Sequence, residues 1–115
     1  MIKRVGGSEI LHSIVEHGGV IYLSGITADD TSGGMSEQAA DICRKIDGLL
    51  AEVGSDRTKL LTAQIFITDM SEKPAMNAVW TKWLAPEHLP CRATIGVADL
   101  GPGIRIEIMV TAGRD

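Results

Sequence analysis

Apolar residues recur along the chain with two different periods, and the period decides which element each segment predicts. Three short runs near the N-terminus predict strands at residues 2–6, 11–17 and 20–24. Gly18-Gly19 supplies the turn between the last two runs. Residues 29–34 are all Asp, Ser, Thr or Gly, which predicts a loop.

A helical period governs two later segments. In the first, Ser36 is the expected N-cap and Gly54 is the expected C-terminal stop. Its apolar positions recur three or four apart: Ala39, Ile42, Cys43, Ile46, Leu49, Leu50 and Val53. The second helix is expected to start at Ser71 and to accept Pro74 in its first turn. Its expected buried stripe is Ala75, Met76, Val79, Trp80 and Trp83.

Alternation of apolar and polar residues predicts three further strands, at residues 58–68, 91–98 and 104–112. In the first of them, one face is expected to carry Leu61, Ala63, Ile65 and Ile67, and the other Thr62, Gln64, Phe66 and Thr68. Gly101-Pro102-Gly103 predicts a turn before the last strand. The order of elements predicts an α+β fold: one domain over residues 1–115, with a mixed sheet and both helices on one face.

The helices can cover only one face of that sheet and leave the other face open. The alternation of residues along each strand predicts which side chains lie on this open face. On the last strand Ile104, Ile106, Ile108, Val110 and Ala112 are expected inside, and Arg105, Glu107, Met109 and Thr111 on the open face. On the preceding strand Cys91, Ala93, Ile95 and Val97 are expected inside, and Arg92, Thr94 and Gly96 on the open face. Val20, Tyr22, Phe66 and Met109 would then form an apolar patch, which burial against sister subunits would cover.

Arg92 and Glu107 are the charged residues at this expected interface. A charge removed from water needs a partner, so the two predict either a structural ion pair or a ligand site. The planar fork of an arginine suits a carboxylate. The residues alone leave both readings open.

Composition narrows the classes of function. The formal net charge is −4, from 11 Lys+Arg and 15 Asp+Glu, and without a basic run the chain does not predict a nucleic-acid surface. The two cysteines form no metal-ligand or CxxC spacing, and His12, His17 and His88 predict ordinary surface histidines, so no metal is expected. No apolar run approaches the roughly 18 residues of a membrane span, and the first residues resemble no secretion signal. A soluble, cytoplasmic protein is expected.

The segment Pro90-Cys91-Arg92-Ala93-Thr94-Ile95, with Asp99-Leu100 and residues 104–108 after it, resembles the signature of the Rid (reactive intermediate deaminase, YjgF-like) family. The spacing from Arg92 to Glu107 matches that signature without a gap. Further matching segments are residues 22–25, 49–54, 65–69 and 76–80. The resemblance spans almost the whole chain.

This resemblance implies a chorismate-mutase-like fold and a homotrimer with clefts between subunits. It implies hydrolysis of 2-imino acids, or their enamine tautomers, to 2-keto acids and ammonia, without metal or cofactor. Arg92 would bind the substrate carboxylate, and Glu107 would orient or activate water. The other residues that it places at the cleft are Ser24, Gly25, Asn77 and Thr94.

Two departures from the family pattern indicate a short, less characterised subgroup. Residues 9–13 stand where the best-studied members carry a Gly-Pro-Tyr loop, and Thr94 stands where they carry a cysteine. Three other functions therefore remain in view: a non-catalytic protein that binds or senses a small keto or amino acid, a ribonuclease, and a chaperone-like protein. Trp80 and Trp83 are expected in the core rather than at a ligand.

Overall fold

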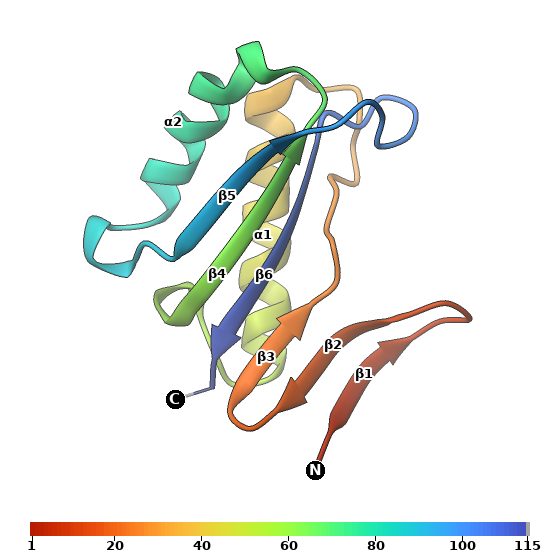
Figure 1. Cartoon of the computed structure of the whole chain (residues 1–115), viewed down its shortest axis with the longest axis vertical. Coiled ribbons are helices and arrows are strands. Elements are labelled where there is room, and N and C mark those ends of the chain that lie inside the picture. Colours follow the sequence, from red (N-terminus) through yellow and green to blue (C-terminus); the bar gives the residue numbers. More distant parts are fainter. Residues whose placement is uncertain (115) are drawn as a thin grey trace.

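Six strands form one mixed sheet in the order β1-β2-β3-β6-β4-β5 (Figure 1). The computed structural model describes residues 1–114, so Asp115, the last residue of the predicted 1–115 domain, lies outside the described residues. The strands are β1 Lys3–Gly7, β2 His12–His17, β3 Val20–Leu23, β4 Leu60–Ile67, β5 Cys91–Gly96 and β6 Ile106–Gly113. Helices α1 (Met35–Glu52) and α2 (Lys73–Trp83) share one hydrophobic core with a single face of the sheet. The predicted α+β class is confirmed.

Strands β1, β2 and β3 form an antiparallel meander, whose second turn uses positive φ angles of 60° at Gly18 and 80° at Gly19. β6 then lies between β3 and β4, antiparallel to both. The last two predicted strands do not pair with each other, because β4 separates them and pairs in parallel with β5. Helix α2 supplies the crossover that a parallel pair needs.

The helix boundaries follow local chemistry. Helix α1 begins at Met35 and its N-cap is Gly34 rather than the predicted Ser36. The reason is Glu37, whose Oε1 accepts the Gly34 N–H at 2.8 Å and so satisfies a free donor at the helix start. At the other end Gly54 has φ of 77°, which suits the predicted stop.

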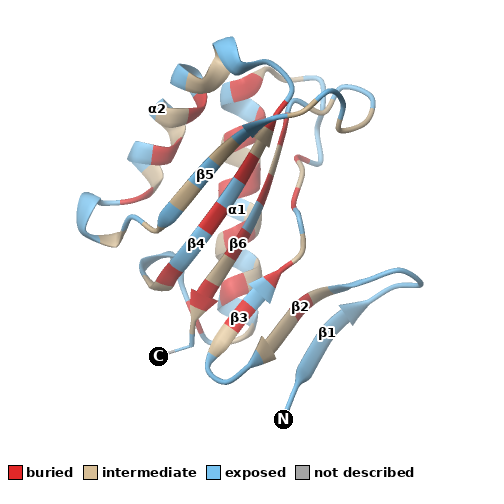
Figure 2. Ribbon diagram, viewed as in Figure 1, coloured by how far each residue is buried: buried red, intermediate tan, exposed pale blue. Residues whose placement is uncertain are grey.

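The core forms between the α1 stripe and the inner face of the sheet (Figure 2). Its fully buried members include Ile42, Ile46, Leu50, Ile65, Ile67 and Ile106. A fully buried residue of this kind contributes about 1.5–3 kcal/mol relative to an exposed one. Leu61 does not share the inner face with Ala63 as predicted, since it is 45% exposed, and Ala75 of the expected α2 stripe is also exposed. An irregularity in the β4–β6 pairing between Leu60 and Thr62 shifts the alternation, and Leu60 takes the inner position instead.

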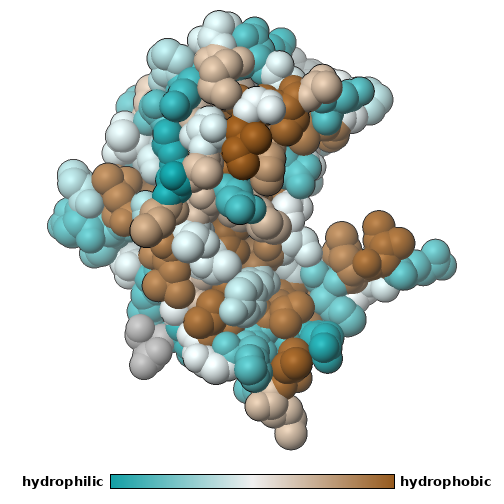
Figure 3. All heavy atoms as spheres, in the orientation of Figure 1, coloured by the Kyte–Doolittle hydropathy of each residue, from teal (hydrophilic) through white to brown (hydrophobic). Residues whose placement is uncertain are grey.

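The open face of the sheet carries apolar side chains between polar ones (Figure 3). Tyr22, Ile95 and Met109 are 47%, 39% and 39% exposed, and Phe66 is half-buried beside them. The β1–β2 arm projects from the body, and a hollow separates its tip, residues 8–11, from the opposite end of the molecule (Figures 1 and 3). Within residues 1–114 neither helix has the length and apolar character needed to cross a bilayer.

Candidate functional site

Arg92 lies on the helix-covered face of the sheet, so the prediction that it faces the open side is wrong. It pairs with Ala63, an inner-face residue that is 2% exposed, and its guanidinium lies over the ring of Trp80 on α2. Its neighbours Cys91, Ala93 and Ile95 are exposed. The reason is that β5 is an edge strand: its apolar row extends the open-face patch, while the long Arg92 side chain fills the gap between β5 and α2.

The Arg92 guanidinium has no carboxylate partner within the described part of the chain, residues 1–114. Its Cζ is 5.6 Å from the centroid of the Trp80 ring, and among residues 1–114 the guanidinium makes no hydrogen bond or ion pair. Burial lowers the pKa of Arg92 from its ordinary value, and no nearby carboxylate counters this effect. Arginine stays protonated throughout the physiological range, so this is a half-buried cation whose N–H edges are available to an anion.

Two polar side chains on the same two elements, β5 and α2, also lack hydrogen-bond partners among the described residues. Thr94 follows Arg92 on the same face of β5, and Asn77 lies one helical turn before Trp80 on α2. Thr94 Oγ1 and Asn77 Oδ1 are both buried and make no hydrogen bond within residues 1–114. An unsatisfied buried polar atom costs about 1–3 kcal/mol, so such atoms are rare unless a ligand or water satisfies them. Arg92, Thr94 and Asn77 thus form one group of candidate residues between α2 and β5.

The other predicted site residues form a second group. Glu107 pairs with Phe66 on the open face of β6, and a Cβ built on Gly25 would collide with its Oε2. The absence of a side chain at Gly25 therefore makes room for the Glu107 carboxylate. Ser24 lies next to Gly25 and donates its hydroxyl to the His12 carbonyl at 2.6 Å.

Ser24 and Gly25 line a cavity of about 320 Å³. The other lining residues are Leu11, Ser13, Ile26, Thr27, Lys45 and Leu49. Lys45 is committed to the protein itself, because its Nζ lies 2.8 Å from both the Thr27 carbonyl oxygen and Asp29 Oδ1. The second group therefore places the Glu107 carboxylate against Gly25, which also lines a mainly apolar hollow, and the one cation among the lining residues, Lys45, is paired with Asp29.

Within one chain Arg92 and Glu107 cannot hold the same small ligand. They lie on opposite faces of the sheet, and β4 lies between their strands, which places the two backbones about 10 Å apart across the sheet. The prediction that both lie in register on one face is wrong. A site that uses both groups must take one from each of two copies.

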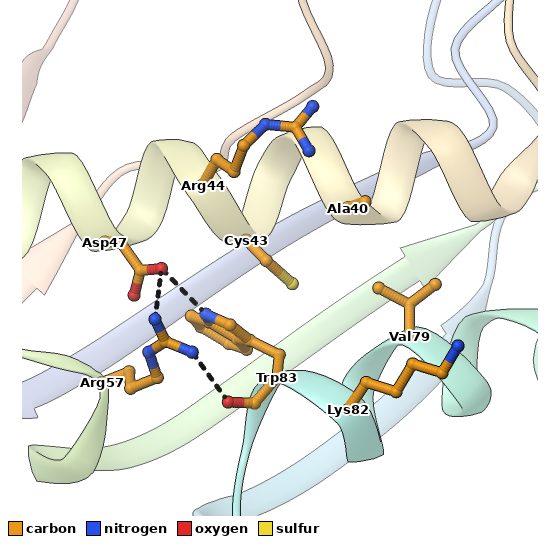
Figure 4. A pocket seen from close by; sticks show the side chains of 8 residues that line it. All are labelled: Ala40, Cys43, Arg44, Asp47, Arg57, Val79, Lys82 and Trp83. Atoms are coloured by element: carbon orange, nitrogen blue, oxygen red, sulfur yellow. Dashed lines mark hydrogen bonds and ion pairs between the residues drawn. The ribbon is translucent and has the colours of Figure 1, made fainter.

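Sequence reasoning missed a cleft between the two helices. A cavity of about 460 Å³ lies between α1 and α2, and Figure 4 shows the Cys43 sulfur and the Trp83 ring directed into it. Asp47 Oδ2 accepts the Trp83 Nε1–H at 3.1 Å and lies 3.2 Å from an Arg57 nitrogen. Burial above all raises the pKa of the Cys43 thiol to about 12, which makes it inert at neutral pH.

Comparisons with known proteins identify several relatives of the chain. The family model described as Endoribonuclease L-PSP matches residues 7–113. A RutC family protein of Haemophilus influenzae is 32% identical over 112 residues, which cover 96% of this chain and 97% of the relative. A crystal structure of a YjgF family member from Neisseria meningitidis is 35% identical with a TM-score of 0.95, covering 100% of this chain and 96% of that one. A Pseudomonas aeruginosa protein gives 32% identity and a TM-score of 0.95 over 100% of both chains.

The mixed sheet with two helices on one face, and its close match to these structures, define a single α+β domain of the chorismate-mutase-like class. The chain belongs to the Endoribonuclease L-PSP family, which is the YjgF or Rid family that its sequence resembles.

Proposed function

We propose that the chain hydrolyses 2-imino acids, or their enamine tautomers, to 2-keto acids and ammonia at a site shared between two copies in a homotrimer. The observation that carries the proposal is the Arg92 guanidinium, half-buried and without a carboxylate partner among residues 1–114. A bidentate carboxylate would supply that partner. Membership of the Rid family supports the same reaction class.

The unsatisfied atoms beside Arg92 fit the rest of such a substrate. A 2-imino acid carries an N–H donor next to its carboxylate, and the Asn77 oxygen is an acceptor that receives no hydrogen bond from any described residue. Thr94 offers a hydroxyl that can donate or accept. In this arrangement Arg92 holds the carboxylate, while Asn77 and Thr94 orient the nitrogen end of the substrate.

The hydrolytic half of the reaction falls to the second group. The iminium carbon is already electrophilic, so holding one water against it supplies much of the rate. Glu107, beside Gly25 and Ser24 of a neighbouring copy, would accept a hydrogen bond from that water. The proposed reaction thus requires no metal or cofactor. We expect the protein to act in the cytoplasm.

The homotrimer is supported by the surface left uncovered in one chain. Tyr22, Ile95 and Met109 expose apolar area on the open face, next to the edge strand β5. Such a patch is characteristic of a surface buried between subunits. Closed rings of identical subunits would bring the Arg92 edge of one copy to the Glu107 face of the next.

The test is ammonia release from freshly generated 2-iminobutyrate. The wild-type protein is expected to accelerate release, and Arg92→Ala is expected to lose at least tenfold in kcat/KM. Asn77→Ala should raise KM more than it lowers kcat, because Asn77 positions the substrate. No acceleration by the wild type, or equal rates for wild type and Arg92→Ala, would refute the proposal.

A non-catalytic carboxylate-binding protein is the second candidate. It is favoured by the completeness of the Arg92 group within one chain, since Arg92, Thr94 and Asn77 need no residue from the open face. Calorimetry with 2-oxobutyrate separates the two functions: Arg92-dependent binding without turnover of 2-iminobutyrate would select the binding protein.

The family's printed description also names an endoribonuclease. A net charge of −4 opposes the phosphate contacts that dominate nucleic-acid affinity. Cleavage of bulk RNA at physiological salt by wild type, lost in Arg92→Ala, would support this function instead.

A further inference from the structure

Arg92 is held by an aromatic surface rather than by an ion pair. Its Cζ lies over the Trp80 ring, 5.6 Å from the ring centroid, and no carboxylate among residues 1–114 forms an ion pair with it. A guanidinium that is held by an aromatic ring rather than by a carboxylate keeps N–H donors for a ligand. The stack therefore fixes the position of the cation while leaving its hydrogen-bonding groups open to a carboxylate.

Trp80 is itself tightly fixed. It is 4% exposed and packs edge-on against Trp83, with ring centroids 5.6 Å apart and planes at 62°. Edge-to-face aromatic pairs of this kind are stabilising beyond the area that they bury. The Trp80 ring thus cannot tilt without disturbing its neighbour.

Trp83 is anchored in turn by polar contacts from two other elements. Its Nε1–H donates to Asp47 on α1 at 3.1 Å, and Arg57 donates to the Trp83 carbonyl at 3.0 Å (Figure 4). Arg57 also lies 3.2 Å from Asp47 and has its Cζ 5.9 Å from the Trp83 ring centroid. Asp47, Trp83 and Trp80 each make at least two of these contacts, so a continuous series of contacts runs from Asp47 through Trp83 and Trp80 to Arg92.

We propose that Trp80 is a positioning residue for carboxylate recognition: its indole, braced by Trp83 and Asp47, holds the Arg92 guanidinium ready for the ligand. The inference rests on the proposed role of Arg92 in binding a carboxylate and deepens it. Without the ring, the long Arg92 side chain samples several rotamers and must be ordered at each binding event. Preorganisation by Trp80 removes that cost, so its loss weakens binding rather than the chemical step.

The first experiment measures 2-oxobutyrate affinity by calorimetry at fixed ionic strength. Trp80→Leu is expected to bind about tenfold more weakly than wild type, a change typical of a cation–π contact of this kind. Trp80→Phe retains an aromatic face and should recover most of the affinity. Leu50→Ala, a core truncation on α1 outside the stack, controls for lost stability and should leave the affinity unchanged. Arg92→Ala should abolish binding.

With 2-iminobutyrate as substrate, Trp80→Leu is expected to raise KM about tenfold and to change kcat by less than twofold. A purely structural role of Trp80 would lower the fraction of active protein and therefore kcat, with KM unchanged.

The proposed carboxylate-binding role of Arg92 and the positioning role of Trp80 are refuted by different results. If Arg92→Ala binds 2-oxobutyrate as wild type does, the function of Arg92 is refuted, and the role of Trp80 falls with it. If binding depends on Arg92 but Trp80→Leu binds as wild type does, the role of Trp80 alone is refuted.

A second measurement needs no core substitution. In the wild-type protein the Arg92 Nε–Hε NMR resonance, assigned by its loss in Arg92→Lys, is expected upfield of the exposed arginines because the Trp80 ring current shields it. A resonance at the position of the exposed arginines would overturn the stacked arrangement, whatever the variants do.

Discussion

Gln38 connects helix α1 to the loop before that helix and to the loop before strand β6. Replacing Gln38 is predicted to destabilise the fold around the start of β6. The residue is fully buried on α1. Its Nε2 donates to the carbonyls of Gly33 at 3.1 Å and Gly103 at 2.9 Å, and its Oε1 accepts the Arg105 N–H at 2.9 Å. It therefore fixes the loop that leads into the strand carrying Glu107.

Gln38→Leu keeps a similar volume but removes these hydrogen bonds. Each buried backbone group left without a partner costs about 1–3 kcal/mol. The Gly33 and Gly103 carbonyls and the Arg105 N–H lose this partner, and nearby solvent can rescue part of the loss. The expected decrease in the free energy of unfolding is therefore about 3 kcal/mol.

The assay is urea unfolding followed by tryptophan fluorescence at one fixed protein concentration, because any association would shift the midpoint. Ser36→Ala, an exposed position two residues away on the same helix, is the control and should change stability by less than about 0.5 kcal/mol. A loss below about 1 kcal/mol for Gln38→Leu would mean that its hydrogen bonds do not fasten the loop, and the reasoning would be refuted.

Two further predictions concern single atoms. In a Cys91→Ser chain, Cys43 should resist alkylation at pH 8, because a pKa of about 12 leaves only about one thiol in ten thousand ionised. Its reactivity should return only when the chain is unfolded. Modification of the folded chain at the rate of a free thiol would contradict this prediction. Gly25→Ala should displace the Glu107 carboxylate and lower kcat for 2-iminobutyrate by on the order of tenfold to hundredfold. Circular dichroism would check that the variant folds. An unchanged kcat would show that Glu107 takes no part in the reaction.

Much of the fold could be predicted because its signals are local. The α1 stripe, the Gly54 stop and the strict alternation on β6 each depend on residues close in sequence. The open-face patch followed from that alternation, and Met109 and Tyr22 are exposed there as predicted. The motif around Arg92 was enough, as a string of residues, to indicate the family.

The orientation of β5 could not be predicted in the same way. Its apolar row, Ala93 and Ile95, fits the inside of a sheet as well as an interface, and only the tertiary structure separates the two. The prediction placed Arg92 on the open face because it assigned this apolar row to the inside, yet Arg92 lies on the helix-covered face, where its guanidinium contacts the Trp80 ring. The irregularity at Leu60 is likewise set by the pairing of β4 with β6 and leaves no signal in the alternation.

The central claim is that one active site takes Arg92 from one copy and Glu107 from another. Arg92→Ala and Glu107→Gln chains, each inactive alone, can be mixed in equal amounts, unfolded and refolded together. Random assembly of a trimer makes about three quarters of the products mixed, and each mixed trimer regains one complete site of its three. The account predicts about one quarter of the wild-type rate of ammonia release from 2-iminobutyrate. A refolded mixture no more active than its two parents would contradict a shared site.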